Sequence, residues 1–503
     1  MKMNKKSILF VMLLIFTLVF TLYSCAIEDK KVNNPDKNAN DASNTDETPQ
    51  KEETTGPKSP VPSDIKFNGA KIRVLHGGHS VDNINSFRAE AINGEIVNDA
   101  LYNRNMKIEH DLDVIFDIKE LITAEEFEDT ITNSVLADID EYDLTVAVQW
   151  TTVPLVTKHV FTNIIDLPYV DLEQIWWPIN YIKEMQIGRD SLFFLTGDMH
   201  LSYIGSIDCI YVNKRVYEDN FGDPDDIYKI VLDGKWTLDK ISEMTKVMYK
   251  DLNGDGKSDL GDQFALVLNT SGNVEHFMYS SGLRTTARDD DWLPHFIVNN
   301  EKTVDFTNTL YSLYYENPGS RVMTYEEVYS GILGEKFMND EVLFCLGGLG
   351  SSASFRDMKA DYALIPFPKY NENEPSYLSL AHDGVFVYSV PLTVPYEKMD
   401  AVGAVLEAMA FESYQAVVPA YFEIALKQKY TRDATDDAFE IIDMIHANCT
   451  TDFAYIYNYA LNNMGLLMRT MMTNKSKNFV SRYEKTEPKS QASLDALIDI
   501  YFQ

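Results

Sequence analysis

The sequence predicts an α/β fold in which mostly parallel sheets are flanked by helices. Short β-rich runs alternate with helical patterns along the chain, and 45% of its 503 residues are hydrophobic. Alternation of strand and helix favours a parallel sheet with right-handed crossovers. The folded part is also longer than one hydrophobic core usually supports, so we expect at least two domains.

The alternation is clearest in the first third of the folded part. Apolar, β-branched runs predict strands at 71–75, 113–116 and 144–148. Between them, apolar residues at helical spacing predict helices at 92–106 and 124–136. Ligands of open parallel sheets bind beyond the carboxyl ends of the strands, so residues that follow these strands are candidate ligand contacts.

Residues 1–24 predict a secretory signal peptide. A lysine-rich start precedes an apolar run at 8–22, which is short for a membrane span. The run ends in Leu-Tyr-Ser-Cys at 22–25, which resembles the lipobox of bacterial lipoproteins. The resemblance implies lipidation of Cys25 and a place on the extracytoplasmic face of the cell membrane. An uncleaved membrane anchor is the alternative, because signal and anchor patterns overlap at this length.

Residues 25–66 predict a disordered tether. The segment is rich in Asn, Asp, Lys, Thr, Glu and Pro and carries few large apolar residues. Such a segment cannot bury enough surface to offset the entropy of ordering. A flexible charged spacer would let the folded body move above the membrane.

Charge and cysteine content narrow the function classes. The net charge of −33 leaves no basic surplus with which to bind nucleic acid or anionic lipid. Besides Cys25, the chain has Cys209, Cys345 and Cys449, an odd number at wide spacing. These positions fit neither a zinc site nor a disulfide framework, so we expect buried, inert thiols.

The segment 251–262 predicts a calcium-binding loop. It carries oxygen-bearing side chains at loop positions 1, 3, 5, 9 and 12 and a glycine at position 6. The expected ligands are Asp251, Asn253, Asp255, Asp259 and Asp262, with the backbone carbonyl of Lys257 at position 7. A bound Ca²⁺ would have a structural role. A solvated acidic turn without metal is the alternative.

Enzyme motifs do not stand out. The sequence has no Gly-x-Ser-x-Gly elbow, no His-Glu-x-x-His and no phosphate loop. His76 and His79 could share a metal, but no third ligand accompanies them. A glycosidase needs two carboxylates facing a cleft, and the pattern singles out no pair. We therefore expect no enzyme. A secreted glycan-active enzyme and a surface adhesion or scaffold lipoprotein remain as alternatives.

The order of several segments resembles the family 1 extracellular solute-binding proteins of ABC importers, the maltose-binding-like group. One segment ends in Tyr-Val-Asn-Lys, another carries Lys-Trp-Thr-Leu-Asp, and later ones carry Asp-Gln-Phe-Ala-Leu, Tyr-Ala-Leu-Ile-Pro-Phe-Pro and Gly-Val-Phe-Val-Tyr-Ser-Val-Pro. They lie at 208–214, 235–239, 262–266, 361–369 and 384–391. The resemblance covers nearly the whole chain beyond the tether.

This resemblance implies a two-lobed periplasmic-binding-protein-like fold of type II. Lobe one would comprise 67–197 and 385–415, and lobe two 198–384 and 416–503. The lobes would close on a ligand by hinge motion. The resemblance further implies a monomer that captures a carbohydrate, expected to be an oligosaccharide, for an ABC permease in the membrane. A binding protein for a peptide or another polar solute is the alternative.

A cleft for sugars needs aromatic faces for the C–H surface and polar groups for the hydroxyls. We expect such contacts after the third strand and at the two crossings between lobes. The candidate ligand-binding residues are Trp150, Asp198, Tyr203, Ser206, His382 and Asp383. A structural role is the alternative for each. Trp176 and Trp177 are expected to pack in the core.

Overall fold

The computed structural model describes residues 57–77, 85–422 and 436–502. The chain divides into two compact units, Met1–Pro57 and Lys58–Gln503, and the fold described below belongs to the second. The predicted signal peptide, Cys25 and most of the predicted tether lie outside the described residues. None of the described helices is both long and apolar enough to cross a membrane.

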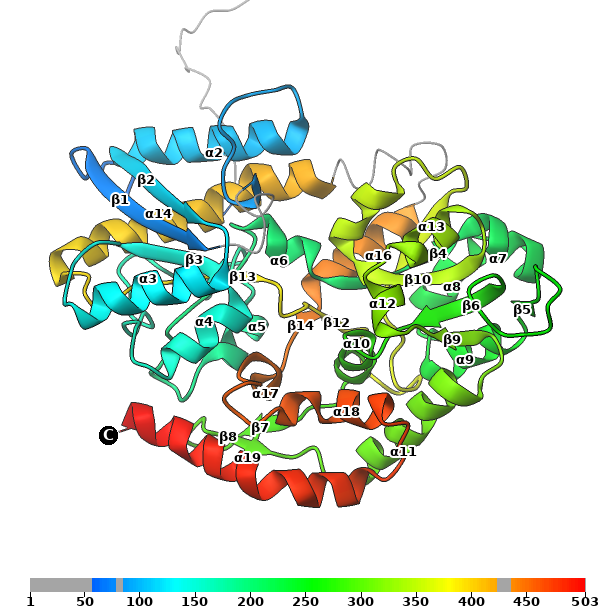
Figure 1. Ribbon diagram of the computed structural model, residues 1–503. Helices are drawn as coiled ribbons and strands as arrows, with labels where there is room; N and C mark the ends of the chain where they lie inside the picture. Colours follow the sequence, from blue (N-terminus) through cyan, green and yellow to red (C-terminus); the bar gives the residue numbers. More distant parts are fainter. Residues whose placement is uncertain (1–56, 78–84, 423–435, 503) are drawn as a thin grey trace, which may run out of the picture. The chain divides into compact units, whose positions relative to one another are not determined.

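The first sheet has the strand order β13-β3-β1-β2 (Figure 1). β1 is parallel to β2 and to β3, and β13 is antiparallel to β3 at one edge. The strands are β1 (Ala70–Gly77), β2 (Val114–Leu121), β3 (Leu144–Val148) and β13 (Phe386–Ser389). The crossover helices are α2 (Ile96–Leu112) and α3 (Ala124–Leu136). Every residue of β3 is buried, as expected for a central strand.

The five predicted elements of this region are confirmed, but several of their boundaries are shifted. α2 spans 96–112, so it begins four residues after its predicted start and ends six residues after its predicted end. Gly94 adopts a left-handed conformation with φ of 85°, and the Glu95 side chain caps the helix by accepting from the Asn98 amide. β2 continues to residue 121, because it pairs with β1 along all eight of its residues.

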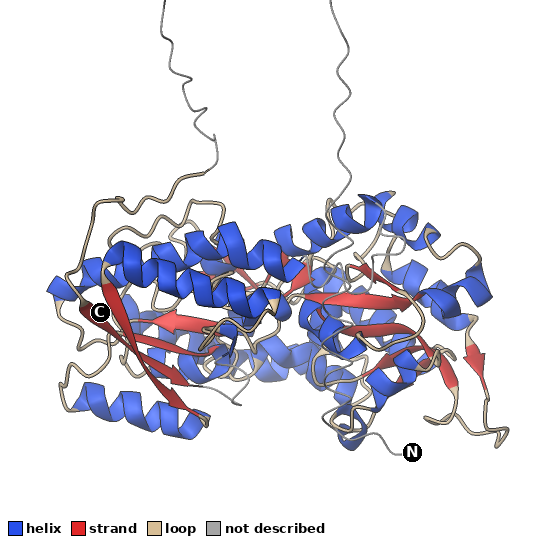
Figure 2. Ribbon diagram, turned by 90° about the horizontal axis from the view of Figure 1, so that it is seen from above, coloured by secondary structure: helices blue, strands red, loops and turns tan. Residues whose placement is uncertain are grey.

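The second sheet is mixed, with the order β11-β4-β10-β6-β5 and with β9 beside β6. β6 is parallel to β10 and β9, whereas β4 is antiparallel to β10 and β11. The strands are β4 (Asp208–Asn213), β5 (Tyr249–Lys250), β6 (Gln263–Leu268), β9 (Ser320–Val322), β10 (Val342–Gly348) and β11 (Tyr362–Ile365). Figure 2 shows the strands of both sheets among surrounding helices. The predicted α/β class is confirmed.

The remaining elements cover the sheets and connect them. They are α4 (Gln149–Val156), α5 (Ile179–Met185), α6 (Leu201–Gly205), α7 (Lys214–Phe221), α8 (Asp226–Leu232), α9 (Leu238–Lys246), α10 (Asn273–Ser280), β7 (Thr286–Arg288), β8 (Pro294–Phe296), α11 (Glu301–Tyr311), α12 (Tyr325–Val328), α13 (Ile332–Met338), β12 (Ser379–Leu380), α14 (Met399–Glu412), α16 (Asp436–Ala447), β14 (Cys449–Thr450), α17 (Phe453–Ile456), α18 (Leu467–Thr473) and α19 (Phe479–Phe502).

The chain segments that run between the two sheets pair with one another. Leu195 bridges to Tyr388, and Ile207 bridges to Ala381, both in antiparallel fashion. α14 packs against α2 near the first sheet, whereas α16 packs against α8 and β11 of the second. The connection between the sheets is therefore several segments wide.

Both ends of the folded unit contact other parts of it. The Tyr501 hydroxyl, near the end of α19, donates to the Val156 carbonyl at 2.6 Å. Near the N-terminus, Val61 and Ile65 are half-buried against the core. Ordered chain thus extends further toward the N-terminus than the predicted end of the tether at residue 66, because these two apolar side chains find a partner surface.

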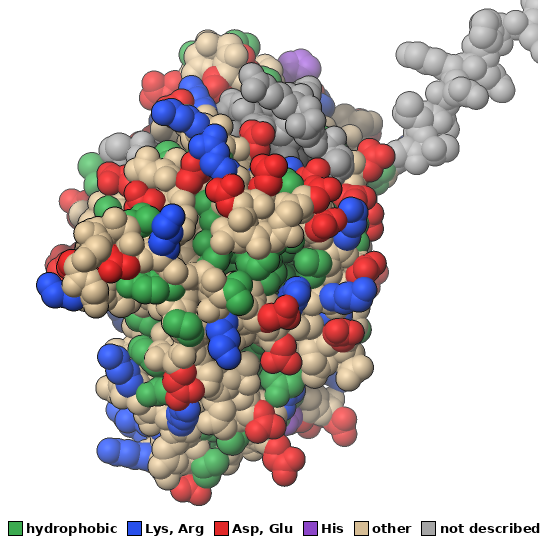
Figure 3. Space-filling view, turned by 90° about the vertical axis from the view of Figure 1, so that its right-hand side faces the viewer, with side chains coloured by type: hydrophobic (Ala, Val, Ile, Leu, Met, Phe, Trp, Pro, Cys, Tyr) green, Lys and Arg blue, Asp and Glu red, His purple; other side chains and the backbone are tan. Residues whose placement is uncertain are grey.

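The three thiols within the fold are free and buried, as predicted. Burial raises the pKa of Cys345 and of Cys449 to about 12, so both remain protonated and unreactive at neutral pH. On the face shown in Figure 3, acidic and basic side chains are interspersed among polar groups.

Candidate ligand-binding site

One pocket lies where strand ends of the two sheets face each other, and we call it the strand-end pocket. Its volume is about 360 Å³, within the range of small-molecule sites. It is lined by Ser86, Val148, Leu201, Ser202, Gly205, Ser206, Gly350, Gly384, Phe386 and Tyr421. Val148 is the last residue of β3, and Gly350 lies two residues beyond β10. This is the edge at which ligands of open α/β sheets bind.

Glycines allow the two sides of this pocket to approach each other. A Cβ on Gly348, at the end of β10, would lie 2.3 Å from the carbonyl oxygen of Gly205 in α6. A Cβ on Gly350 would lie 3.2 Å from the same oxygen. Three of the lining residues, Gly205, Gly350 and Gly384, are glycines, so backbone N–H and C=O groups contribute to the pocket wall.

The predicted residues Ser206, His382 and Asp383 lie at this pocket or beside it. Ser206 lines it, and its carbonyl accepts from the His382 amide at 2.9 Å. Nδ1 of His382 lies 3.0 Å from Oδ1 of Asp383 and accepts from the Gly384 amide at 3.1 Å. Both side chains are partly exposed. The second crossing thus presents an imidazole and a carboxylate next to the pocket.

A buried polar cluster, which the sequence did not reveal, continues from His382. The His276 ring meets the His382 ring at 5.9 Å, and its Nε2 lies 2.8 Å from Oδ2 of Asp208. On the same helix as His276, Glu275 pairs with Arg469 at 2.8 Å. Asp208 could have attracted notice as a charge at the start of an apolar strand, but its partners are distant in sequence.

Burial controls the protonation of this cluster. It raises the pKa of the Asp208 carboxyl well above its usual range and lowers the pKa of His276 to about 4. The His276 imidazole is therefore uncharged at neutral pH. Oδ2 of Asp208, Oε1 of Glu275 and both ring nitrogens of His276 lack hydrogen-bond geometry to any described residue. Buried polar groups without partners are rare and costly in folded proteins.

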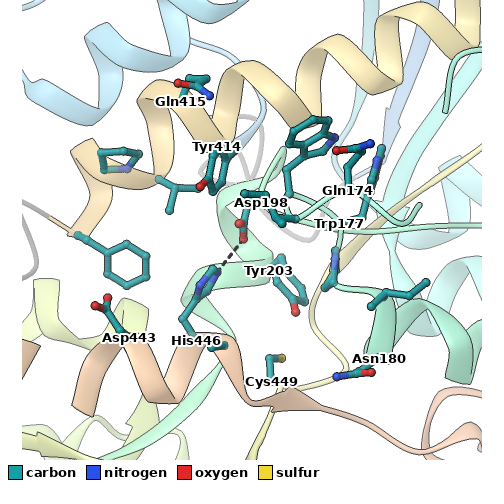
Figure 4. Close-up of a pocket in the computed structure, with 18 of the residues that line it drawn as sticks. Gln174, Trp177, Asn180, Asp198, Tyr203, Tyr414, Gln415, Asp443, His446 and Cys449 are labelled. Atoms are coloured by element: carbon teal, nitrogen blue, oxygen red, sulfur yellow. Dashed lines mark hydrogen bonds and ion pairs between the residues drawn. The ribbon is translucent and has the colours of Figure 1, made fainter. Parts of the chain in front are cut away.

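A second pocket lies on the other side of α6, and we call it the indole pocket. Its volume is about 880 Å³. It is lined by Glu173, Gln174, Ile175, Trp176, Trp177, Pro178, Ile179, Asn180, Asp198, Tyr203, Tyr414, Gln415, Val418, Pro419, Phe422, Asp443, His446, Ala447 and Cys449. It contains two predicted residues, Asp198 and Tyr203. Figure 4 shows the Asp198 carboxylate facing the imidazole of His446, with Tyr203 beside them.

The two tryptophans of the indole pocket are held by one carboxylate. Trp176 and Trp177 are 1% and 3% exposed, which confirms their predicted place in the core. Their indole N–H groups donate to the two oxygens of Glu407, in α14, at 2.7 and 2.9 Å. The Asp171 amide donates to the same side chain. Glu407 thus fixes the orientation of both rings.

Asp198 and His446 contact each other in the lining of the indole pocket. Oδ1 of Asp198 lies 3.0 Å from Nε2 of His446. Burial disfavours the imidazolium, but the charge and hydrogen bond of Asp198, together with the charge of Asp443, outweigh it, so the pKa of His446 is raised. Sequence reasoning missed His446 because it lies 248 positions from its partner.

The stability that this pair contributes is expected to depend on pH. A histidine whose pKa is higher in the folded than in the unfolded state contributes stability below about 6.5 and loses it as the pH rises through the folded value. His446→Gln should lower the free energy of unfolding by about 1 kcal/mol at pH 5.5 and by less at pH 8.5. Urea unfolding of both proteins at both pH values measures this difference. An equal loss at the two pH values would contradict the assignment.

Trp150 and His76 line neither of the two pockets. Trp150 is the second residue of α4 and packs, half-buried, against the core. His76 is buried, with its ring stacked on Phe386 at 5.3 Å, and His79 lies outside the described residues. Within the described part of the chain, no three His, Cys, Asp or Glu residues are arranged to hold a metal ion.

The acidic loop 251–262 closes on itself. The two carboxylate oxygens of Asp251 accept from the amides of Gly254 and Gly256, at 2.6 and 3.0 Å. Both glycines have φ of 73°, the left-handed conformation that the sharp turn requires. Asp262 accepts from the Asp259 amide at 3.2 Å. The oxygen donors suit calcium by type, but in this conformation they are engaged with the backbone of the loop.

This protein is similar to known proteins in its three-dimensional structure and not in its sequence. No protein-family model matches the chain, and no curated protein matches it. The maltose/maltodextrin-binding domain MalE of Bdellovibrio bacteriovorus, bound to maltotriose, superimposes with a TM-score of 0.50 at 15% identity, covering 86% of this chain and 100% of that one. UgpB of Mycobacterium tuberculosis, in complex with glycerophosphocholine, gives 0.52 at 13% identity, covering 86% and 100%.

A third neighbour is similar to the same extent. It is the galacto-N-biose-/lacto-N-biose I-binding protein of the ABC transporter from Bifidobacterium longum, in complex with lacto-N-biose. It gives a TM-score of 0.52 at 11% identity and covers 86% of this chain and 98% of that one. The chain therefore has the two-lobed α/β fold of ABC-transporter solute-binding proteins, as the segment order predicted.

Proposed function

We propose that this protein is the substrate-binding component of an ABC importer and that it captures a carbohydrate, expected to be an oligosaccharide, between its two lobes. The observation that carries the proposal is the strand-end pocket, which lies between the two sheets of a solute-binding fold. Two of the three neighbours described above hold a sugar. The neighbours are binding proteins, which agrees with the absence of an enzyme motif in the sequence.

The polar groups beside the strand-end pocket suit a ligand rich in hydroxyls. Ser206, His382 and Asp383 offer donors and acceptors at its edge. Behind them, the neutral imidazole of His276 can donate and accept, and the carboxyl oxygens of Asp208 can accept. Sugar hydroxyls also donate and accept, so they can complete hydrogen bonds that these buried groups lack once the lobes open to admit a ligand.

Delivery to a membrane permease and attachment through Cys25 complete the proposal. A lipid on Cys25 and the polar segment that follows it would hold a monomeric binding protein at the extracytoplasmic face of the cell membrane. Metabolic labelling of the full chain with a fatty-acid analogue tests this part. Label on the native protein and none on Cys25→Ser would support it, and equal labelling of both would contradict it.

Ligand capture is tested by thermal unfolding of the chain from Ala26 onward with panels of oligosaccharides, short peptides and glycerophosphodiesters. A ligand at 100 times its dissociation constant should stabilise the fold by about 2.7 kcal/mol. We expect a shift with one class of sugar and no hydrolysis of that sugar. A shift with peptides alone, or the appearance of sugar products, would contradict the proposal.

Ser206→Leu localises the site. The leucine side chain would occupy part of the strand-end pocket, so the affinity for the sugar should fall at least about tenfold, which corresponds to 1.4 kcal/mol. Ser206 is only partly buried, so the fold should tolerate the change. Ser330→Leu, at an exposed serine outside both pockets, is the matched control and should bind normally. Isothermal titration measures both affinities.

Calcium binding by the loop 251–262 is a separate part of the proposal. Its support is the spacing of six oxygen donors around Gly254. If Ca²⁺ displaces the backbone bonds of Asp251, the melting temperature should rise in millimolar calcium and fall back in a chelator. Asp251→Asn should abolish the rise. Identical melting in calcium and chelator would show that the loop is a metal-free turn.

A further inference from the structure

The indole pocket takes no part in the proposed capture of sugar. It shares no lining residue with the strand-end pocket. The short helix α6 separates the two, since Leu201, Ser202 and Gly205 face the strand-end pocket and Tyr203 faces the indole pocket. A volume of about 880 Å³ is ample for a small ligand of its own.

The charges that line the indole pocket are unbalanced. Among the residues that the structure describes, three carboxylates line it, Glu173, Asp198 and Asp443, and one basic group does so, the imidazole of His446. No lysine or arginine is present among the described lining residues. A pocket lined by one sign of charge concentrates ions of the opposite sign, so this one favours cations and disfavours anions.

The rings of the indole pocket point to the same class of ligand. Trp176, Trp177, Tyr203, Tyr414 and Phe422 contribute to its walls. Tyr414 and Phe422 are only partly buried, so part of each ring is open to the pocket and its mouth. Figure 4 shows Tyr414 above Asp198, on the helical segment that continues α14. Aromatic faces attract organic cations, and they do so more strongly when the cation is desolvated.

We propose that the indole pocket is a second binding site and that its ligand is a small organic cation of the quaternary ammonium class. The open parts of the Tyr414 and Phe422 rings would contact the alkyl groups, and the carboxylates of Asp443 and Glu173 would balance the charge. A sulfate, a phosphate or an anionic sugar would meet these acidic groups, with no compensating lysine or arginine in the described lining. This site goes beyond the proposed sugar capture and does not depend on it.

The test is a titration of the chain from Ala26 onward with choline and with its uncharged isostere 3,3-dimethylbutan-1-ol, at constant ionic strength. The two probes have nearly the same shape and differ in charge. We expect choline to bind and the isostere to bind at least tenfold more weakly. Tenfold corresponds to about 1.4 kcal/mol, which the cation–aromatic and charge interactions of choline would supply. Equal binding of both probes, or binding of neither, would overturn the proposal.

Two variants locate the choline. Asp443→Asn removes an exposed carboxylate of the pocket, and Phe422→Leu keeps an apolar side chain but removes a ring. Each should weaken choline binding about fivefold. Glu440→Gln removes an exposed carboxylate from the same helix, outside the pocket, and should leave binding unchanged. Ser206→Leu should leave it unchanged as well. Choline binding that survives both pocket variants, or that Ser206→Leu abolishes, would place the cation elsewhere.

Discussion

Glu407→Ala is expected to lower the free energy of unfolding by about 3 kcal/mol. The substitution leaves the indole N–H groups of Trp176 and Trp177 without their acceptor, and each unsatisfied buried donor costs about 1–3 kcal/mol. It also opens a cavity where a fully buried side chain had been. Urea unfolding followed by tryptophan fluorescence measures the loss of stability.

Two further variants separate the hydrogen bonds of Glu407 from general damage to its helix. Glu407→Gln keeps the volume and one acceptor oxygen, so it should lose less stability than the alanine variant. Asp400→Ala removes an exposed acid from the first turn of the same helix, where a carboxylate contributes at most about 1 kcal/mol. If Glu407→Ala unfolded at the same urea concentration as Asp400→Ala, the carboxylate would not be holding the indoles.

The first sheet could be predicted from sequence because its signals are local. The run at 71–75 contains Ile72, Val74 and Leu75, which are buried in β1, and the run at 144–148 is buried throughout in β3 of the same sheet. The start of α2 was predicted too early, because Gly94 takes a left-handed conformation that apolar spacing does not indicate. The second sheet gave weaker signals, because several of its strands are two to four residues long.

The candidate sites were harder to predict because their geometry depends on distant partners. Asp198, Tyr203 and Ser206 were predicted to lie together at the first crossing, but Asp198 and Tyr203 line one pocket and Ser206 lines another. Trp150 was expected beyond a strand end. α4, however, begins directly after β3 without a loop, and this carries the tryptophan onto a helix that packs against the core. Pairs such as Asp208 with His276 leave no trace in a single sequence.

Gly348→Ala should weaken both the fold and the capture of ligand. The new Cβ would lie 2.3 Å from the carbonyl oxygen of Gly205, a backbone atom that cannot rotate away. The end of β10 and helix α6 must therefore separate, and such overpacking typically costs about 1–3 kcal/mol. The same movement displaces Gly205, Ser206 and Gly350, which form one side of the strand-end pocket. We expect sugar affinity to fall at least about tenfold.

Gly334→Ala is the matched control for this close approach. At that position, within α13, the added Cβ would make only an ordinary contact, 3.7 Å from the Phe355 ring. Alanine also favours a helix over glycine by up to about 1 kcal/mol, so this variant should be as stable as the native protein or more so. Thermal unfolding and isothermal titration of both variants provide the comparison. Equal stability and equal sugar affinity of Gly348→Ala and Gly334→Ala would contradict this prediction. The contact between β10 and α6 would then not shape the ligand site, and the strand-end pocket would not be the site of sugar binding.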